Sequence, residues 1–186
     1  MQSKSSKIQT RPIEDLIGRI RTLRQKGDKE IRISAQEADQ LADSLSQVMT
    51  RMVSIQEEII AQNQRLKIIT KILRDKLEES KRYKPIDISP AKKEIEYWRG
   101  GFHACNGCDA DVAKKLGADL SLVGYVQKVS NLILNINIFM RDAKTGKLVE
   151  VQSVDVRGNT DETWKRSMSY MIRNRILDDK WSHMKE

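Results

Sequence analysis

The chain has 186 residues, of which 39% are hydrophobic and 32% are charged, with 34 Lys and Arg against 26 Asp and Glu. This length excludes two large catalytic domains, and the composition excludes a low-complexity or disordered chain. The net charge of +8 suggests polyanion binding only where the basic residues cluster.

The basic residues form two modest groups, each interleaved with acidic or apolar positions, as is typical of a solvated helix face. No zinc finger, basic zipper or RNA-recognition motif accompanies them. The sequence therefore disfavours nucleic-acid binding. The groups are Arg19, Arg21, Arg24 and Lys26, and Lys165, Arg166, Arg173 and Arg175.

Two features bear on membranes and location. The longest apolar run, around Leu132–Leu134, is far shorter than the roughly 20 residues that cross a bilayer. The segment Met1–Thr10 is polar and lacks the apolar core of a secretion signal. We therefore expect no transmembrane segment and, for the chain as written, a cytoplasmic location.

The first predicted element is a short helix over 12–26, which we assign with its connector to residues 1–33. Its apolar residues recur at helical spacing, and Gly27 stands where a helix terminator belongs. Glu30–Ile33 is predicted to add a brief extended piece. The apolar face of the helix carries Ile13, Leu16, Ile17, Ile20 and Leu23.

A long helix is predicted over 34–80. Ser34 lies three residues before Glu37, which is the spacing of a capping box. No Gly or Pro occurs between Ser34 and Ser80. Apolar residues then alternate at spacings of three and four, which predicts a left-handed coiled coil. The predicted seam is Leu41, Leu45, Val48, Met52, Ile55, Ile59, Gln62 and Leu66, continuing to Ile69 and Leu73.

A stripe of this length favours a homo-oligomer, because it is difficult to bury within one chain of this size. The alternative is that the chain folds back, so that the first helix and the later domain cover separate parts of the stripe. Gln62, the polar seam residue, could fix register or oligomer number. The flanking positions show no regular Glu and Lys alternation, so strand orientation and oligomer number stay open.

Residues 81–186 predict a small α/β domain, which makes the fold class α+β. In the second long strand, apolar residues alternate with Asn135 and Asn137, which marks one buried face. The Gly-bearing segment 142–147 predicts a hairpin connection, and hence an antiparallel meander. The predicted elements are strands over 85–88, 120–129, 132–141 and 148–157, and helices over 109–117 and 163–177.

Four ordered segments resemble a bacterial domain family of unknown function: Cys-Asn-Gly-Cys at 105–108, Leu-Gly-Ala-Asp at 116–119, 126–134 and 155–164. The resemblance covers about residues 68–177. More distantly, the layout is similar to the amino-terminal domain of TolB and to CsgG-type envelope proteins. The resemblance implies export and an additional first strand. Here the long helix occupies that place, so either the sheet lacks this strand, or Glu30–Ile33 or a partner chain supplies it.

Cys105 and Cys108 form the one constellation that suggests chemistry. They immediately precede a predicted helix, whose dipole favours a thiolate, whereas Asp109 opposes it. The spacing suits a disulfide, a redox pair or half of a metal site. Zinc requires four ligands and only His103 lies nearby, so we predict no metal and no cofactor. The leading interpretation is a structural disulfide or an inert thiol pair.

Polar residues near the ends of the predicted strands are candidates for a ligand surface, although turn and capping chemistry explains most of the segment 157–164. We find no catalytic triad, nucleotide-binding glycine loop or paired acidic cluster. The expected function is a non-enzymatic, oligomeric interaction protein, and the alternative is a thiol-disulfide redox protein. The surface candidates are Lys128, Asn131, Arg157, Asn159 and Asp161.

Overall fold

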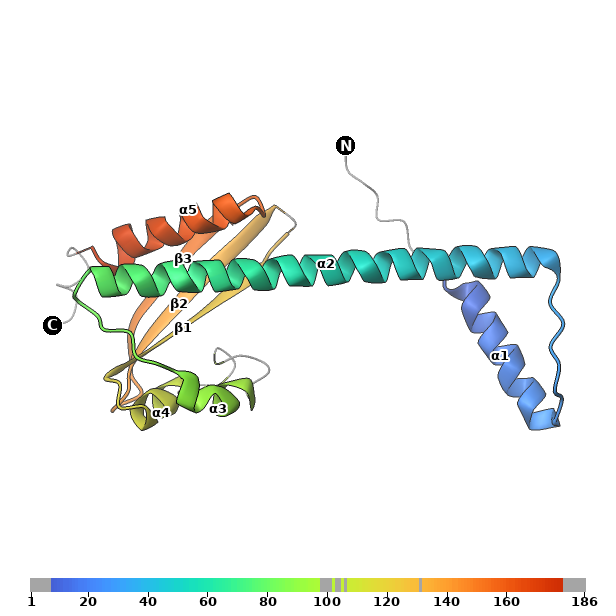
Figure 1. The fold of residues 1–186 in the computed structure, drawn as a ribbon, viewed down its shortest axis with the longest axis horizontal. Coiled ribbons are helices and arrows are strands. Elements are labelled where there is room, and N and C mark those ends of the chain that lie inside the picture. The colour runs from blue at the N-terminus through green and yellow to red at the C-terminus, as the bar shows by residue number, and fades with distance from the viewer. Residues whose placement is uncertain (1–7, 98–101, 103–104, 106, 131, 179–186) are drawn as a thin grey trace. The chain divides into compact units, whose positions relative to one another are not determined.

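The computed structural model describes residues 8–97, 102, 105, 107–130 and 132–178. The fold is α+β: a long helix α2 (Ala35–Glu79) precedes a three-stranded antiparallel sheet and the helix α5 (Asp161–Met171) (Figure 1). Backbone contacts divide the chain into two units, Met1–Asn63 and Gln64–Glu186. The boundary falls inside α2, so the long helix contributes residues to each unit.

In the first unit, helix α1 (Arg11–Lys26) has Pro12 in its first turn and ends at Gly27, whose φ is +81°. The predicted capping box opens α2, because the Glu37 N–H donates to Ser34 Oγ at 3.2 Å and the Ser34 N–H donates to Glu37 Oε2 at 2.7 Å. Glu30–Ile33 does not form a strand. Arg19 Nη2 instead donates to the Arg32 carbonyl at 2.6 Å, so a side chain partners that carbonyl.

In the second unit, the sheet is a meander in the order β1 (Leu120–Lys128), β2 (Ile133–Asp142) and β3 (Leu148–Arg157). Both pairings are antiparallel, and the register shifts between Met140 and Arg141. The predicted hairpin loop therefore joins β2 and β3. The predicted alternation in β2 is confirmed, because its apolar residues are buried and Asn135 and Asn137 point to the opposite face.

The core lies between one face of the sheet, the second half of α2, and α5 with the π-helical turn η3 (Ile172–Ile176) that follows it (Figure 1). Trp164 from α5 is 2% exposed and Leu134 from β2 is 1% exposed. The buried cluster consists of Ile69, Leu73, Leu77, Leu134, Ile136, Ile138, Val156, Trp164, Met168, Met171, Ile172 and Ile176.

Along the chain, three short helices follow α2 and precede the sheet: η1 (Ser89–Ala91), α3 (Lys92–Tyr97) and α4 (Cys108–Lys115). The strand predicted over 85–88 is wrong, because these residues adopt no regular structure. Pro85 has no N–H to donate to a sheet, and the Ile86 carbonyl accepts from Arg74 Nη2 at 2.8 Å. Local side-chain hydrogen bonds thus take the place of strand pairing.

Over the described residues, the helices are each too short or too polar to cross a membrane.

Candidate functional site

The most prominent surface feature of the first unit is an apolar stripe along α2. The seam residues Leu45, Met52, Ile55 and Ile59 are 44%, 64%, 46% and 53% exposed. Leu41, Val48 and Gln62 are half-buried. Contiguous apolar surface of this kind marks interaction sites in proteins.

The same stripe has a different environment nearer the end of α2. Leu66 is 38% exposed, whereas Ile69, Leu73 and Leu77 are 4%, 8% and 6% exposed and belong to the core of the second unit. The periodicity is continuous across this change. The sheet and α5 therefore cover the last turns of the stripe and leave the turns before them without cover from those elements.

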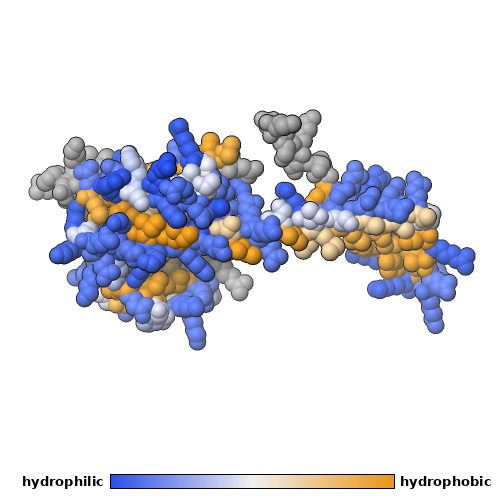
Figure 2. Space-filling view, turned by 45° about the horizontal axis from the view of Figure 1, so that its top comes forward, coloured by the Kyte–Doolittle hydropathy of each residue, from blue (hydrophilic) through white to orange (hydrophobic). Residues whose placement is uncertain are grey.

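The first unit has no apolar core of its own within its described residues, 8–63. Every hydrophobic side chain there is half-buried or exposed, and α1 contains no buried residue. Ser44 is the buried residue of this segment, at 2% exposure, and its hydroxyl donates to the Gln40 carbonyl at 2.8 Å. Figure 2 shows apolar surface along this part of the chain. A unit built in this way gains stability by covering its apolar faces.

A second site lies at the start of α4, where Cys105 and Cys108 form a disulfide with their Cα atoms 5.7 Å apart. Gly107, which precedes Cys108, has a φ of +109°, a conformation that favours glycine. Cys108 is the first residue of α4. The disulfide therefore fixes the chain direction at the point where the helix begins.

Helix α4 is attached to the sheet by the buried carboxylate of Asp109, which is 5% exposed. It accepts from Ser121 Oγ of β1 at 2.5 Å and lies 3.5 Å from Arg141 Nε of β2. A buried charge requires such partners. These contacts hold the disulfide against the end of the sheet where β2 leads into β3.

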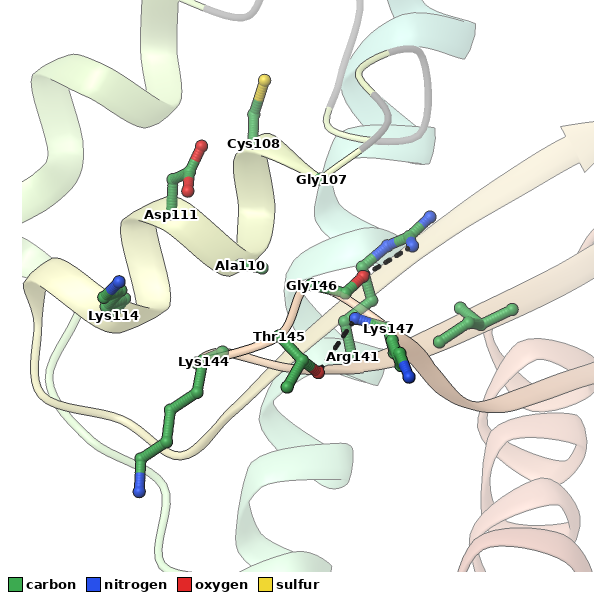
Figure 3. A pocket seen from close by; sticks show the side chains of 12 residues that line it. Gly107, Cys108, Ala110, Asp111, Lys114, Arg141, Lys144, Thr145, Gly146 and Lys147 are labelled. Carbon is green, nitrogen blue, oxygen red and sulfur yellow. Dashed lines mark hydrogen bonds between the residues drawn. The ribbon is translucent and has the colours of Figure 1, made fainter.

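An open groove of about 760 Å³ lies beside the disulfide, between α4 and the β2–β3 loop (Figure 3). Its charged lining is predominantly basic, with Asp111 as the acidic member. The loop is well ordered by hydrogen bonding, because Asp142 Oδ1 accepts from the Thr145 N–H at 2.7 Å. Arg141 Nη1 donates to the Gly146 carbonyl at 3.3 Å. The basic lining residues are Lys114, Arg141, Lys144 and Lys147.

The hydrogen bonds within the β2–β3 loop also change the pKa of the Asp142 carboxyl group. The Thr145 N–H, aided by the Thr145 hydroxyl, lowers the pKa of Asp142 below its usual value of 3.8. The ionised Asp142 carboxylate accepts these hydrogen bonds and thereby holds the loop that carries Lys144 and Lys147.

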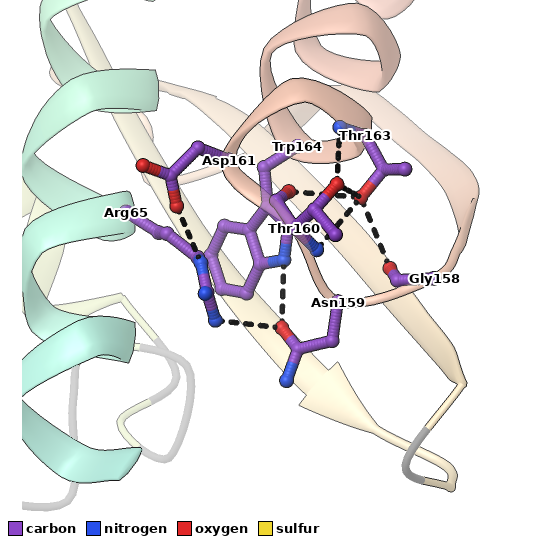
Figure 4. A network of polar contacts seen from close by, with 7 residues as sticks. All are labelled: Arg65, Gly158, Asn159, Thr160, Asp161, Thr163 and Trp164. Carbon is purple, nitrogen blue, oxygen red and sulfur yellow. Dashed lines mark hydrogen bonds and ion pairs between the residues drawn. The ribbon is translucent and has the colours of Figure 1, made fainter. Parts of the chain in front are cut away.

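The predicted surface residues Asn159 and Asp161 take part in an internal network (Figure 4). Asn159 Oδ1 accepts from Trp164 Nε1 at 3.1 Å and from Arg65 Nη1 at 3.0 Å. Asp161 Oδ1 accepts from Arg65 Nε at 2.8 Å. These side chains fasten α2 to the start of α5, and the Oδ1 atom of each accepts hydrogen bonds within the fold.

Lys128 and Arg157 lie at the ends of β1 and β3 and are exposed. Neither lines the groove beside the disulfide. Asn131 and His103 lie outside the described residues. The structure thus brings Asn159 and Asp161 together but does not gather the predicted surface residues into one pocket.

Some residues of these sites carried no recognisable sequence signal. Arg65 lies one position before the seam residue Leu66 and reads as an ordinary surface cation. The pairing of Asp109 with Ser121 and Arg141 joins positions whose proximity follows only from the packing of α4 on the sheet. Among the described residues, no group of three or more His, Cys, Asp and Glu side chains is placed to hold a metal ion.

A family described as "Protein of unknown function (DUF2380)" matches residues 48–176, which is more than half of the chain. The match begins within the exposed stripe of α2 and extends through α5 into η3. No curated protein and no solved structure matched the chain.

Proposed function

The chain belongs to the family of unknown function whose model spans residues 48–176, and we propose that it acts as a non-enzymatic, self-associating interaction protein. One observation carries this proposal. Five residues of the α2 stripe are exposed, whereas its continuation at Ile69 and Leu73 is buried in the core of the second unit; the exposed residues are Leu45, Met52, Ile55, Ile59 and Leu66. The exposed part has the pattern of a helix seam without a covering partner.

The energetics support a second copy as that partner. Full burial of one Leu, Ile or Met side chain contributes about 1.5–3 kcal/mol. A row of such residues can therefore offset the cost of association, which is several kcal/mol. A period of 3.5 residues keeps the row on one side of the helix, so a second helix with the same pattern fits it.

The proposal is tested by a double substitution, Leu45→Asp/Ile59→Asp, which places charge within the seam. The matched control, Thr50→Asp/Gln64→Asp, adds the same charge to exposed positions on the opposite face of α2. In sedimentation velocity, the wild type and the control should sediment as an assembly and the seam variant as a monomer. Equal sedimentation of all proteins would exclude the stripe as the assembly surface.

In this proposal the second unit provides the binding surface, and assembly makes that surface multivalent. The basic lining of the groove between α4 and the β2–β3 loop supports an acidic ligand. Binding of an acidic peptide library should weaken as salt concentration rises, and Lys144→Glu/Lys147→Glu should abolish it. Unchanged binding by that variant would place the surface elsewhere.

A thiol-disulfide redox protein is the second candidate, supported by the disulfide between Cys105 and Cys108 at the edge of the groove. In that reaction a substrate dithiol would lose two electrons and two protons to form a disulfide, while the Cys105–Cys108 bond would be reduced to two thiols. Asp109 and Asp111 in the first turn of α4 oppose a reactive thiolate. Cys105→Ser/Cys108→Ser should therefore preserve ligand binding and assembly, and loss of function with assembly intact would favour the redox role.

The cellular location is also a proposal. In the cytoplasm thiols are kept reduced. The resemblance to TolB and CsgG-type envelope proteins suggests an oxidising compartment instead. Trapping the thiols in intact cells with an alkylating reagent distinguishes these locations, because the Cys105–Cys108 pair would be modified in the cytoplasm and protected in the envelope.

A further inference from the structure

The two flanks of the α2 stripe differ in chemistry. If Leu45, Met52 and Ile59 are heptad position a, then Arg51 and Glu58 occupy position g, and both are exposed. On the other flank, Met49 at position e and Val53 and Ile60 at position b are 66%, 55% and 49% exposed. The same flank also carries Gln56 and Asn63 at position e, so between Leu45 and Asn63 one flank of the seam is charged and the other is uncharged.

Orientation of two paired helices decides which flanks meet. In a parallel pair, position g of one helix faces position e of the other, so each side of the seam brings a charged flank against an uncharged flank. In an antiparallel pair, g faces g and e faces e. The charges then share one side, and the uncharged residues share the other.

The charges also match across the antiparallel pair. Arg51 of one copy lies opposite Glu58 of the second copy, and the twofold symmetry repeats the pair. In a parallel pair in register, Arg51 would face Gln56 and Glu58 would face Asn63, with no ion pair. No opposite charge lies three or four residues from Arg51 or Glu58 in the sequence, so charge reversal at these positions breaks no ion pair of that spacing within the helix.

Resting on the proposed self-association, we propose that α2 pairs antiparallel with a second copy of this chain about a twofold axis between Val53 and Ser54. The seam then consists of Leu45 against Gln62, Val48 against Ile59 and Met52 against Ile55, each repeated by symmetry. All of these residues belong to the first unit.

The polar seam residue is compatible with this arrangement. Gln62 Nε2 donates to Glu58 Oε1 of its own helix at 3.2 Å. Its amide therefore has a partner without a second Gln62 opposite, which a parallel pair would provide. A carboxylate has acceptor capacity for several donors, so Glu58 can accept from Gln62 and from Arg51 of the second copy together.

Cysteine cross-linking tests the orientation. Leu45→Cys and Gln62→Cys are made separately in the Cys105→Ser/Cys108→Ser background, so that each protein has one thiol. Antiparallel pairing predicts disulfide-linked dimers when the two proteins are mixed and oxidised, and none from either protein alone. Cross-linking of each protein with itself, without the mixed product, would overturn the orientation in favour of a parallel pair.

Light scattering on the same samples separates failure of the orientation from failure of self-association. A dimer or larger assembly without the mixed cross-link would overturn the antiparallel register alone. A monomeric mass would overturn both proposals.

Charge reversal provides a second test with the native cysteines intact. Arg51→Glu or Glu58→Arg alone places like charges opposite each other and should weaken association by about 2- to 10-fold at low salt. The double variant Arg51→Glu/Glu58→Arg restores opposite charges and should return the dissociation constant to the wild-type value. Additive weakening in the double variant would overturn the antiparallel arrangement.

Discussion

Arg65 of α2 and Asp161 at the start of α5 form an ion pair with Nε 2.8 Å from Oδ1, although 96 positions separate them in the sequence. The Arg65 side chain is only 17% exposed. It also donates to Asn159, which accepts from the buried Trp164. Arg65 thus connects α2 to α5, and both helices pack on the same face of the sheet.

We therefore predict that Arg65→Ala destabilises the second unit by about 1–2 kcal/mol, because it removes hydrogen bonds from Asn159 and Asp161. Urea unfolding followed by Trp fluorescence measures this. The control is Lys71→Ala, which removes the exposed ion pair to Asp75 on the same helix and should leave unfolding unchanged. Equal effects of the two substitutions would contradict a fastening role for Arg65.

The turn before α5 gives a prediction about backbone conformation. Gly158 has a φ of +91°, and an added Cβ would lie 3.4 Å from Thr163 Cγ2. Gly158→Ala should cost about 1–2 kcal/mol, because L-residues disfavour this conformation. Gly18→Ala, in the open interior of α1, should instead stabilise that helix by roughly 0.5–1 kcal/mol. Thermal unfolding by circular dichroism measures both, and an unaffected Gly158→Ala protein would show that the turn tolerates a side chain.

The disulfide closes a very short loop, so its effect on stability should be limited. The chain-entropy estimate for a loop of this size is about 2 kcal/mol. Reduction of Cys105–Cys108 should lower the stability of the second unit by about that amount and leave β1, β2 and β3 formed. Denaturant unfolding with and without dithiothreitol is the measurement, and Cys105→Ser/Cys108→Ser should not respond to the reductant. Complete unfolding on reduction would mean that the disulfide supports the whole unit.

The β2–β3 loop should respond to acid. Because the Thr145 N–H lowers the folded-state pKa of Asp142 below 3.8, ionised Asp142 stabilises the loop above that pH. This contribution is lost as pH falls through the folded-state pKa. The Lys144 and Thr145 amide signals in nuclear magnetic resonance should therefore shift below about pH 4, and Asp142→Asn should remove that transition. A transition retained in Asp142→Asn would assign it to another carboxyl group.

Local patterns in the sequence predicted several elements that the structure contains. The capping chemistry of Ser34 and Glu37 marked the start of α2, and the alternation of β2 marked its buried face. These signals depend on neighbouring residues. They also led to the fold class, because a long uninterrupted helix followed by alternating strands leaves few arrangements.

The errors and omissions concern contacts between distant segments. Pro85–Ile88 has strand-forming residues, but Arg74 partners the Ile86 carbonyl and no neighbouring strand is available. Heptad spacing could not indicate that Ile69 would face the sheet while Ile59 stays exposed, because spacing is the same in both settings. The sequence near Arg65 resembles that of an exposed helix face, because its partners Asn159 and Asp161 lie more than 90 positions away.

The solution mass of the wild-type chain by light scattering tests the central claim most directly. The largely exposed stripe from Leu45 to Leu66 predicts a dimer or larger assembly, whose apparent mass rises toward a plateau as protein concentration increases. The Leu45→Asp/Ile59→Asp variant should remain a monomer over the same range. A wild-type chain that is monomeric at every concentration would contradict the account and would mean that the stripe is covered within its own chain.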